Sequence, residues 1–154
     1  MFTIYTLFKF LHVAAVIVWV GGLVTISLIT ARLGREQDRA AMAAMSRQSA
    51  FFGQTIIGPS AGITLVAGIV MVIDAGIGFD TLWVAWGLVG VIVSMGLGST
   101  VIRRAGEQLS ELAPTAEPND ARVIALQNRL RVTSLFNMLL LVSVVAMMVF
   151  KPTL

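Results

Sequence analysis

A lysine and the only histidine of the chain lie within a stretch that is otherwise almost entirely apolar, KFLHVAAVIVWVGG (9–22). His12 follows Lys9 by three positions and precedes Trp19 by seven, so an α-helix brings all three onto one face. An imidazole there can ligate haem iron, bind copper together with methionine sulfur, or carry a proton at near-neutral pH. It can also be a neutral group that is hydrogen-bonded to a neighbouring helix. All four interpretations are open at this point.

The segments around this histidine are long and apolar enough to cross a membrane. The chain of 154 residues is 57% hydrophobic and only 12% charged, with a mean hydropathy of +0.90. Its charged residues leave four gaps of about 20 residues, at 10–31, 48–73, 81–102 and 132–150. About 20 residues suffice to span ~30 Å of hydrocarbon at 1.5 Å per residue. The sequence therefore predicts an all-α integral membrane four-helix bundle that forms one transmembrane domain.

The predicted helices cover residues 3–33, 48–74, 81–112 and 120–151, to within a few positions. Gly34 is expected to end the first, and Asn119 or Asp120 to cap the last. Residues 36–50 are good helix formers and predict an extension that leads into the second helix, while Pro59 should kink that helix. Outside the membrane, the third and fourth helices should pair through an apolar seam. The seam residues are Leu109, Leu112, Ile124, Leu126 and Leu130.

The arginines predict the orientation of the bundle. Two of the three inter-helix segments are basic, whereas DAGIGFD (74–80) contains two aspartates and no basic residue. The basic ones carry Arg32, Arg35, Arg39 and Arg47, and Arg103, Arg104, Arg122, Arg129 and Arg131. The positive-inside rule then places both termini outside (N-out/C-out) and the helical extensions in the cytoplasm. The net charge of +3 is explained by this topology and by contact with membrane lipids, so we do not expect nucleic acid as a partner.

Projection of the first helix places its polar and aromatic residues on one face, which we expect to be the inward face. This face comprises Tyr5, Phe8, Lys9, His12, Val16, Trp19, Leu23 and Thr30. His12 should lie ~12 Å below the external end. Residues 65–68, 87–90 and 141–143 of the other helices are expected at its level. Gly87 and Gly90 then have two interpretations: close helix packing, or room for a flat ligand in front of the histidine.

A candidate cofactor site follows from this face. In a haem site, His12 would be the metal ligand, Tyr5, Phe8 and Trp19 would line the macrocycle, and Lys9 would pair with a propionate. One histidine allows five-coordinate iron, a methionine or water as sixth ligand, or a haem shared between two copies. For copper, Met71, Met147 and Met148 are the nearest sulfurs. The chain contains no cysteine, which excludes disulfides and thiolate sites.

A second polar set lies in the predicted cytoplasmic half of the membrane. We interpret it as hydrogen bonds between helices, or alternatively as a path for protons or a solute. Its members are Ser27, Thr30, Gln54, Thr55, Ser60, Ser99, Thr100, Thr133, Ser134 and Asn137.

The first helix resembles a group of small bacterial four-helix membrane proteins, through Lys9, His12, Trp19, Gly22 and Leu23. The group includes the membrane domain of copper-resistance protein D, the four-helix protoporphyrinogen oxidase, and a family of integral membrane proteins of unknown function to which the chain is most similar. The resemblance covers nearly the whole chain and implies a bacterial inner membrane. The oxidase is associated with haem b and also uses a lysine in its third helix. The third helix of this chain has no lysine, so oxidase activity is not predicted.

We therefore expect a protein that binds b-type haem or porphyrin through His12, with a redox or porphyrin-handling role. The alternatives are copper handling or transport, and a non-catalytic membrane scaffold or accessory protein. We also expect a homodimer or larger assembly. Neither a substrate nor a redox partner follows from these residues.

Overall fold

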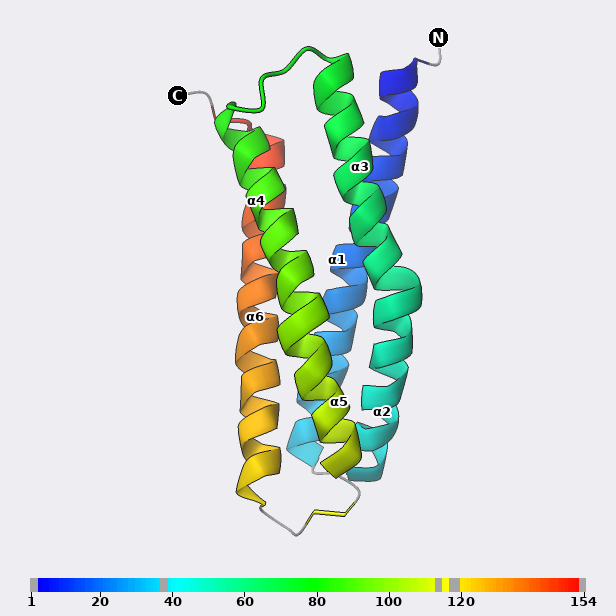
Figure 1. Ribbon diagram of the computed structural model, residues 1–154, viewed down its shortest axis with the longest axis vertical. Coiled ribbons are helices and arrows are strands. Elements are labelled where there is room, and N and C mark those ends of the chain that lie inside the picture. The colour runs from blue at the N-terminus through cyan, green and yellow to red at the C-terminus, as the bar shows by residue number, and fades with distance from the viewer. Residues whose placement is uncertain (1–2, 37–38, 113–114, 117–119, 153–154) are drawn as a thin grey trace.

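Four long helical segments run side by side in the computed structural model, which describes residues 3–36, 39–112, 115–116 and 120–152 (Figure 1). Two of the four segments are continuous through a short π-helical stretch. In chain order the elements are α1 (Ile4–Glu36); α2 (Arg39–Phe52), η1 (Gly53–Ile57) and α3 (Gly58–Asp74); α4 (Leu82–Gly96), η2 (Leu97–Ile102) and α5 (Arg103–Leu112); and α6 (Ala121–Phe150). The described residues contain no strand.

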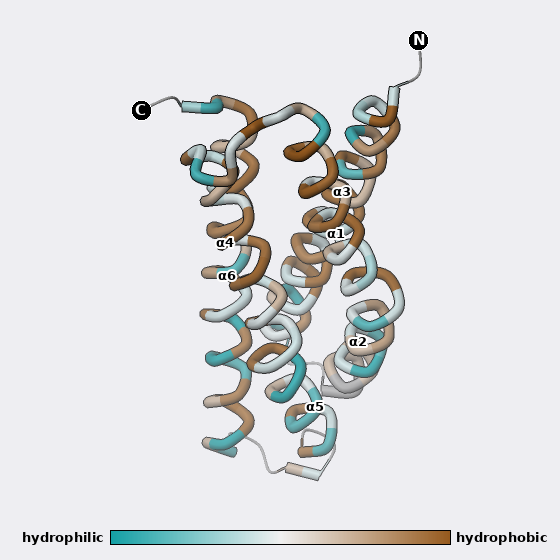
Figure 2. The backbone as a smooth tube through the Cα atoms, turned by 45° about the horizontal axis from the view of Figure 1, so that its top comes forward, coloured by the Kyte–Doolittle hydropathy of each residue, from teal (hydrophilic) through white to brown (hydrophobic). Residues whose placement is uncertain are grey.

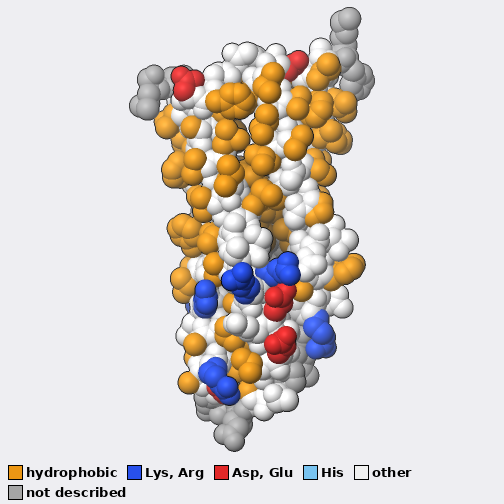
Figure 3. Space-filling model, viewed as in Figure 1, with side chains coloured by type: hydrophobic (Ala, Val, Ile, Leu, Met, Phe, Trp, Pro, Cys, Tyr) orange, Lys and Arg blue, Asp and Glu red, His pale blue; other side chains and the backbone are white. Residues whose placement is uncertain are grey.

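Each of the four segments is long and apolar enough to span a membrane. The apolar stretch that could span a membrane contains 30 to 33 residues in each segment, or ~45–50 Å of α-helix, whereas the hydrocarbon core is ~30 Å thick. Hydrophobic residues dominate the end of the bundle that carries both termini, and polar residues are concentrated at the opposite end (Figure 2). Arginines gather at this opposite end on the face seen in Figure 3. We call the end of the bundle opposite the termini the basic end. The predicted four-helix membrane bundle is confirmed, and part of it extends beyond the bilayer.

The helices are arranged as two pairs. α1 packs mainly along α3 and α4 packs mainly along α6, with thinner contacts joining α1 to α6 and α3 to α4 (Figure 1). Two aromatic contacts tie α4 to α6 at the end away from the basic end. Trp86 Nε1 donates to Ser143 Oγ at 3.1 Å, and Lys151 Nζ lies 5.1 Å from the centre of the Trp83 ring. Among the described residues α1 and α4 make no close backbone approach, so they are diagonal neighbours.

Both π segments have a local chemical cause. Pro59 has no amide hydrogen, so the Thr55 carbonyl cannot receive its usual bond from position i+4, and the proline ring would clash with that carbonyl. The helix widens instead, and the amide of Gly58 bonds the Gly53 carbonyl, five residues back. At η2 the hydroxyl of Thr100 donates to the Gly96 carbonyl at 2.6 Å, where an α-helical amide would bond. The disturbance predicted at Pro59 is therefore a π segment.

Two separate apolar clusters form the core. Trp19, Ala61, Val91 and Leu141 meet where all four segments cross the middle of the bundle. Near the basic end, Met42 and Leu109 are buried, with partly buried apolar side chains packed around them. Those side chains are Leu33, Val123, Leu126 and Leu130. The predicted seam is thus confirmed at Leu109, Leu126 and Leu130, whereas Ile124 is exposed.

The predicted helix bounds need one correction. Gly34 does not end the first helix, which continues to Glu36, and Arg32 Nε donates to Glu36 Oε1 at 2.9 Å across the glycine. The predicted extension is confirmed over the described residues, because the helical segment from Arg39 continues into the second span without a break. At α6 the predicted cap is confirmed at Asp120, whose Oδ1 accepts from the Arg122 amide at 2.8 Å. Asn119 lies outside the described residues.

The Asp120 cap gives a pH-dependent prediction. Hydrogen bonds from the Arg122 side chain and then its amide hold the pKa of Asp120 below its ordinary value of 3.8. A carboxyl whose pKa is depressed by folding stabilises the protein above the unfolded pKa, and this stabilisation is lost as the pH falls through the folded pKa. We expect Asp120→Ala to lower the melting temperature in detergent at pH 7. The difference from the unmodified protein should shrink as the pH falls below 3.8.

Asp120→Asn is the matched control for this prediction, because asparagine also caps helices but has no charge. It should melt above Asp120→Ala at pH 7 and show a weaker pH dependence than the unmodified protein. Equal melting temperatures for all three proteins at pH 7 would contradict a contribution of this cap to stability.

Candidate functional site

The face of α1 predicted to point inward is turned into the bundle, except at one residue. Trp19 is buried, His12 and Phe8 are half-buried, and Lys9 is exposed. Trp19 belongs to the central apolar cluster and lies seven residues from His12, or ~10 Å along the helix axis. Phe8 and Lys9 therefore lie about one turn from His12, and Trp19 lies two turns deeper. Tyr5 is half-buried two turns nearer the terminal end.

His12 is fixed to the neighbouring helix by a hydrogen bond. Its Nδ1 lies 2.8 Å from the carbonyl oxygen of Thr64 in α3. A carbonyl can only accept, so Nδ1 carries the hydrogen and donates. In the neutral imidazole the other nitrogen, Nε2, then holds a free lone pair. Thr64 is itself buried, and its hydroxyl donates to the Ser60 carbonyl at 2.9 Å. The acceptor is thus built into a rigid part of α3.

Gly68 makes room for the imidazole. A Cβ atom at this position would lie 3.2 Å from Cε1 and 3.3 Å from Nδ1 of His12, closer than most such contacts in proteins. The glycine therefore allows α3 to approach α1 closely enough for the bond to Thr64. The predicted depth of the histidine, level with residues 65–68, is confirmed. The importance of Thr64 and Gly68 was missed, although Ser60, Thr64 and Gly68 follow one another at intervals of four and so mark one face of α3.

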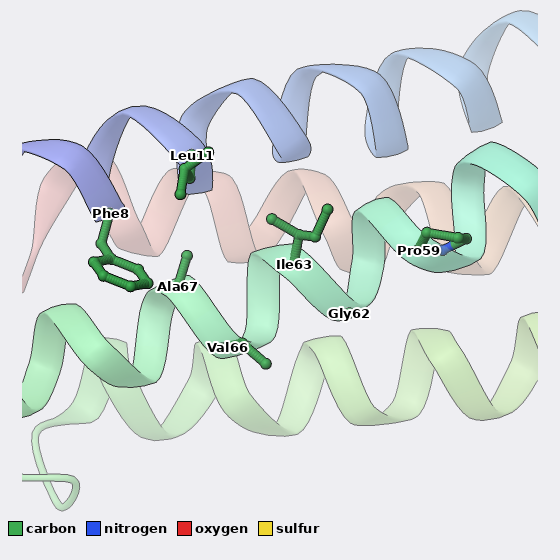
Figure 4. A pocket seen from close by; sticks show the side chains of 7 residues that line it. All are labelled: Phe8, Leu11, Pro59, Gly62, Ile63, Val66 and Ala67. Atoms are coloured by element: carbon green, nitrogen blue, oxygen red, sulfur yellow. The ribbon is translucent and has the colours of Figure 1, made fainter.

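An apolar groove of about 450 Å³ lies beside this contact, between α1 and α3 (Figure 4). Phe8 and Leu11 contribute from α1, and the phenyl ring of Phe8 lies against Ala67. The lining residues on α3 are Pro59, Gly62, Ile63, Val66 and Ala67. Leu11, Ile63 and Val66 are exposed, so the groove opens on the outer surface of the bundle. Phe8 was predicted to line a haem macrocycle inside the bundle, whereas its ring borders this groove on the outer surface.

Gly87 and Gly90 face α6. A Cβ at Gly90 would overlap Cγ2 of Val144, and one at Gly87 would overlap Cε of Met148. Both glycines are buried in this helix contact. Of the two interpretations of these residues, close packing accounts for their present surroundings. The glycine in contact with His12 is Gly68.

His12 is not accompanied by other strong metal ligands. The chain has one histidine and no cysteine. The described residues contain no group of three or more histidine, cysteine, aspartate or glutamate side chains that could hold a metal ion. What the site can provide is a single oriented imidazole nitrogen in an apolar setting. Such a site suits a metal that arrives with most of its own ligands.

Comparison with known proteins identifies one family. The family described as "Predicted integral membrane protein (DUF2269)" matches residues 6–152, which include the whole bundle except the first two residues of α1. Neither a curated protein nor a solved structure matches the chain.

Proposed function

We propose a function for this chain from the fact that it belongs to the DUF2269 family of predicted integral membrane proteins. The proposed function is to bind a b-type haem or a porphyrin through His12 within the membrane, with a redox or porphyrin-handling role. This proposal includes a distant relation to the copper-resistance D domain and the four-helix protoporphyrinogen oxidase, through Lys9, His12 and Trp19. Haem supplies an iron centre for one-electron chemistry when it is bound.

The hydrogen bond from His12 to Thr64 is the observation that carries this proposal. Histidines that ligate metals almost always donate their other ring N–H to a carboxylate, a carbonyl or water, which sets the tautomer and orients the ring. His12 Nδ1 makes this bond at 2.8 Å, and Gly68 provides the space for the ring to approach α3. Nε2 is therefore the nitrogen that would hold the iron.

The donor set also favours haem over a bare copper ion. Copper would need additional histidine, methionine or cysteine ligands from the protein. Haem iron has four nitrogen ligands from the porphyrin and needs only one or two from the protein. With a single histidine in the chain, His12 fits haem better. Lys9 is exposed one turn from His12 and can pair with an anionic group such as a propionate.

A second candidate role is a structural one, in a non-catalytic scaffold or accessory protein. The same bond and the contact with Gly68 favour it, because they connect α1 to α3 directly. Interhelical hydrogen bonds in membranes contribute about 0.6 kcal/mol on average. In this role the imidazole stabilises the pair, and Nε2 has no ligand.

Two substitutions of His12 separate these roles. His12→Asn retains a side-chain N–H close to the position of Nδ1, so it can still donate to Thr64, but it has no counterpart of Nε2. His12→Ala loses both groups. When expressed with ample haem and purified in detergent, the unmodified protein should show a Soret band. We expect both variants to lose at least nine-tenths of that absorbance, with His12→Asn melting at a higher temperature than His12→Ala.

Other outcomes are equally specific. A colourless unmodified protein, or a Soret band that survives in both variants, would refute haem binding through His12. If the preparation is colourless and His12→Ala only lowers the melting temperature, the structural role is supported. Copper is tested by metal analysis after loading, where less than about one tenth of an equivalent per chain excludes it as a resident metal.

Orientation and assembly complete the proposal. The gathering of arginines at one end of the bundle (Figure 3) supports placing the basic end in the cytoplasm of a bacterial inner membrane, with both termini outside. A homodimer that shares one haem between two histidines is the assembly we propose. A haem content of one per two chains would support it.

A further inference from the structure

Two polar side chains lie in the core of the basic half of the bundle without a hydrogen-bond partner. Ser94 of α4 and Asn137 of α6 are each 3% exposed. Ser94 Oγ and Asn137 Oδ1 have no partner among the described residues. Neither can turn toward lipid headgroups or bulk water, because both are covered by protein. They face the interior of the bundle.

Such groups are costly to bury without a partner. A buried amide or hydroxyl that lacks a hydrogen bond costs about 1–3 kcal/mol by mutational data, and more in hydrocarbon-like surroundings. Asn137 Oδ1 can only accept, so its partner must be a hydrogen-bond donor. Native proteins meet this need with ordered water when protein donors are absent. A water molecule inside the bundle would satisfy both groups, because it can donate to Asn137 Oδ1 and bond with the Ser94 hydroxyl.

Few residues are buried between this pair and the basic end. On the side of the termini, the central cluster of Trp19, Ala61, Val91 and Leu141 is tightly buried. Toward the basic end, α1 has no buried residue after Trp19, and α6 has none before Asn137. Neither η1 nor η2 contains a buried residue. The next buried apolar side chains are Ala105 of α5, and Met42 and Leu109 of the separate cluster near the basic end.

Hydroxyl side chains line this loosely packed stretch. Ser27 and Thr30 of α1 and Thr133 and Ser134 of α6 are half-buried. They belong to the polar set for which the sequence left two interpretations open. A dry helix interface would be expected to bury at least some residues here, as the central cluster does.

We propose that the basic half of the bundle contains a water-filled vestibule. It lies between the Met42–Leu109 cluster and the Trp19 cluster, and water enters it from the basic end beside the first of these clusters. It passes the hydroxyls of α1 and α6 and reaches Ser94 and Asn137. Its ligand is water, which donates to Asn137 Oδ1 and bonds with Ser94 Oγ. The vestibule is independent of the proposed haem site, which lies beyond Trp19 at the other side of the central cluster.

The absence of natural cysteines makes this proposal directly testable. Single-cysteine variants are made in the full chain, reconstituted into sealed vesicles, and treated with a charged methanethiosulfonate reagent that does not cross membranes. Ser94→Cys replaces a hydroxyl by a thiol, which reacts only where water allows it to ionise. We expect it to react at least tenfold faster than Val91→Cys, one turn away in the Trp19 cluster.

Two further variants define the geometry of this test. Arg104→Cys is exposed at the basic end and identifies the side of the membrane from which that end is reached. Ser94→Cys must react from the same side. Ile92→Cys controls for lipid contact, because Ile92 is close to Ser94 in the chain and faces outward. We expect it to be unreactive. Asn137→Cys carries the same expectation as Ser94→Cys and replaces it if that variant does not fold.

A rate for Ser94→Cys or Asn137→Cys less than tenfold above that of Val91→Cys would overturn the vestibule. So would faster reaction from the side opposite to Arg104→Cys. Reaction from the Arg104 side that exceeds both Val91→Cys and Ile92→Cys tenfold would support it. Because none of these positions contacts His12, the result does not depend on whether haem is bound.

Discussion

Trp19→Ala is expected to lower the free energy of unfolding by about 2–3 kcal/mol. Trp19 is 3% exposed and packs against Ala61, Val91 and Leu141 at the middle of the bundle. Truncation of a tryptophan in a water-soluble core costs about 3–5 kcal/mol, from lost transfer free energy and from the cavity that remains. In a membrane the unfolded helices are already in lipid, so the transfer contribution is small. The cavity and the lost dispersion contacts remain.

The measurement is reversible unfolding in mixed detergent micelles, with Trp86→Ala as the matched control. Trp86 is 41% exposed and makes one hydrogen bond, to Ser143, so its truncation should cost less than about 1 kcal/mol. If Trp19→Ala were no more destabilising than Trp86→Ala, the central cluster would not be the main packing contact of the bundle.

Gly90→Ala should destabilise the protein by about 1–3 kcal/mol, the range expected when extra volume is forced into a packed contact. The new methyl group would overlap Cγ2 of Val144, which is buried in α6. A β-branched valine has a single favoured rotamer in a helix, so Val144 cannot turn away and the two helices must separate. Thermal or detergent unfolding of the protein without any added ligand measures the effect.

Three controls identify the cause. The double variant Gly90→Ala/Val144→Ala should recover part of the loss, because the two positions touch. Gly87→Ala meets only the flexible end of Met148 and should cost less. Gly96→Ala meets nothing within 4 Å, so its higher helix propensity should leave stability unchanged or raise it. An unchanged stability of Gly90→Ala would instead support space for a ligand at this glycine.

Much of the fold could be predicted from the sequence because the physics behind it is local. Four charge-free gaps of the right length determine four spans, whatever their neighbours. The depth of His12 followed from counting residues along a helix of known rise, and its contact with Gly68 agrees. The cap at Asp120 is likewise a property of a few consecutive residues.

Which helices lie next to one another could not be predicted in the same way. Periodicity specifies the face and the depth of a residue but not the order of helices around a bundle. His12 could equally have faced the glycines of the third helical segment, and in the structure it faces α3 while α1 and α4 lie diagonally. Gly87 and Gly90 consequently met α6. Charge patterns also cannot show that Ser94 and Asn137 would be buried without partners.

The two π segments change the direction in which side chains point on one side of each segment relative to the other side. Each contains hydrogen bonds that reach one residue further than in an α-helix, which is equivalent to inserting one residue. One residue corresponds to ~100° of rotation around an α-helix. A helical wheel drawn through residues 39–74 or 82–112 as one continuous helix therefore misplaces the residues after the π segment by ~100° relative to those before it. Deletion of one residue from η2 would remove the extra residue and would therefore leave the arginines beyond it in their present directions.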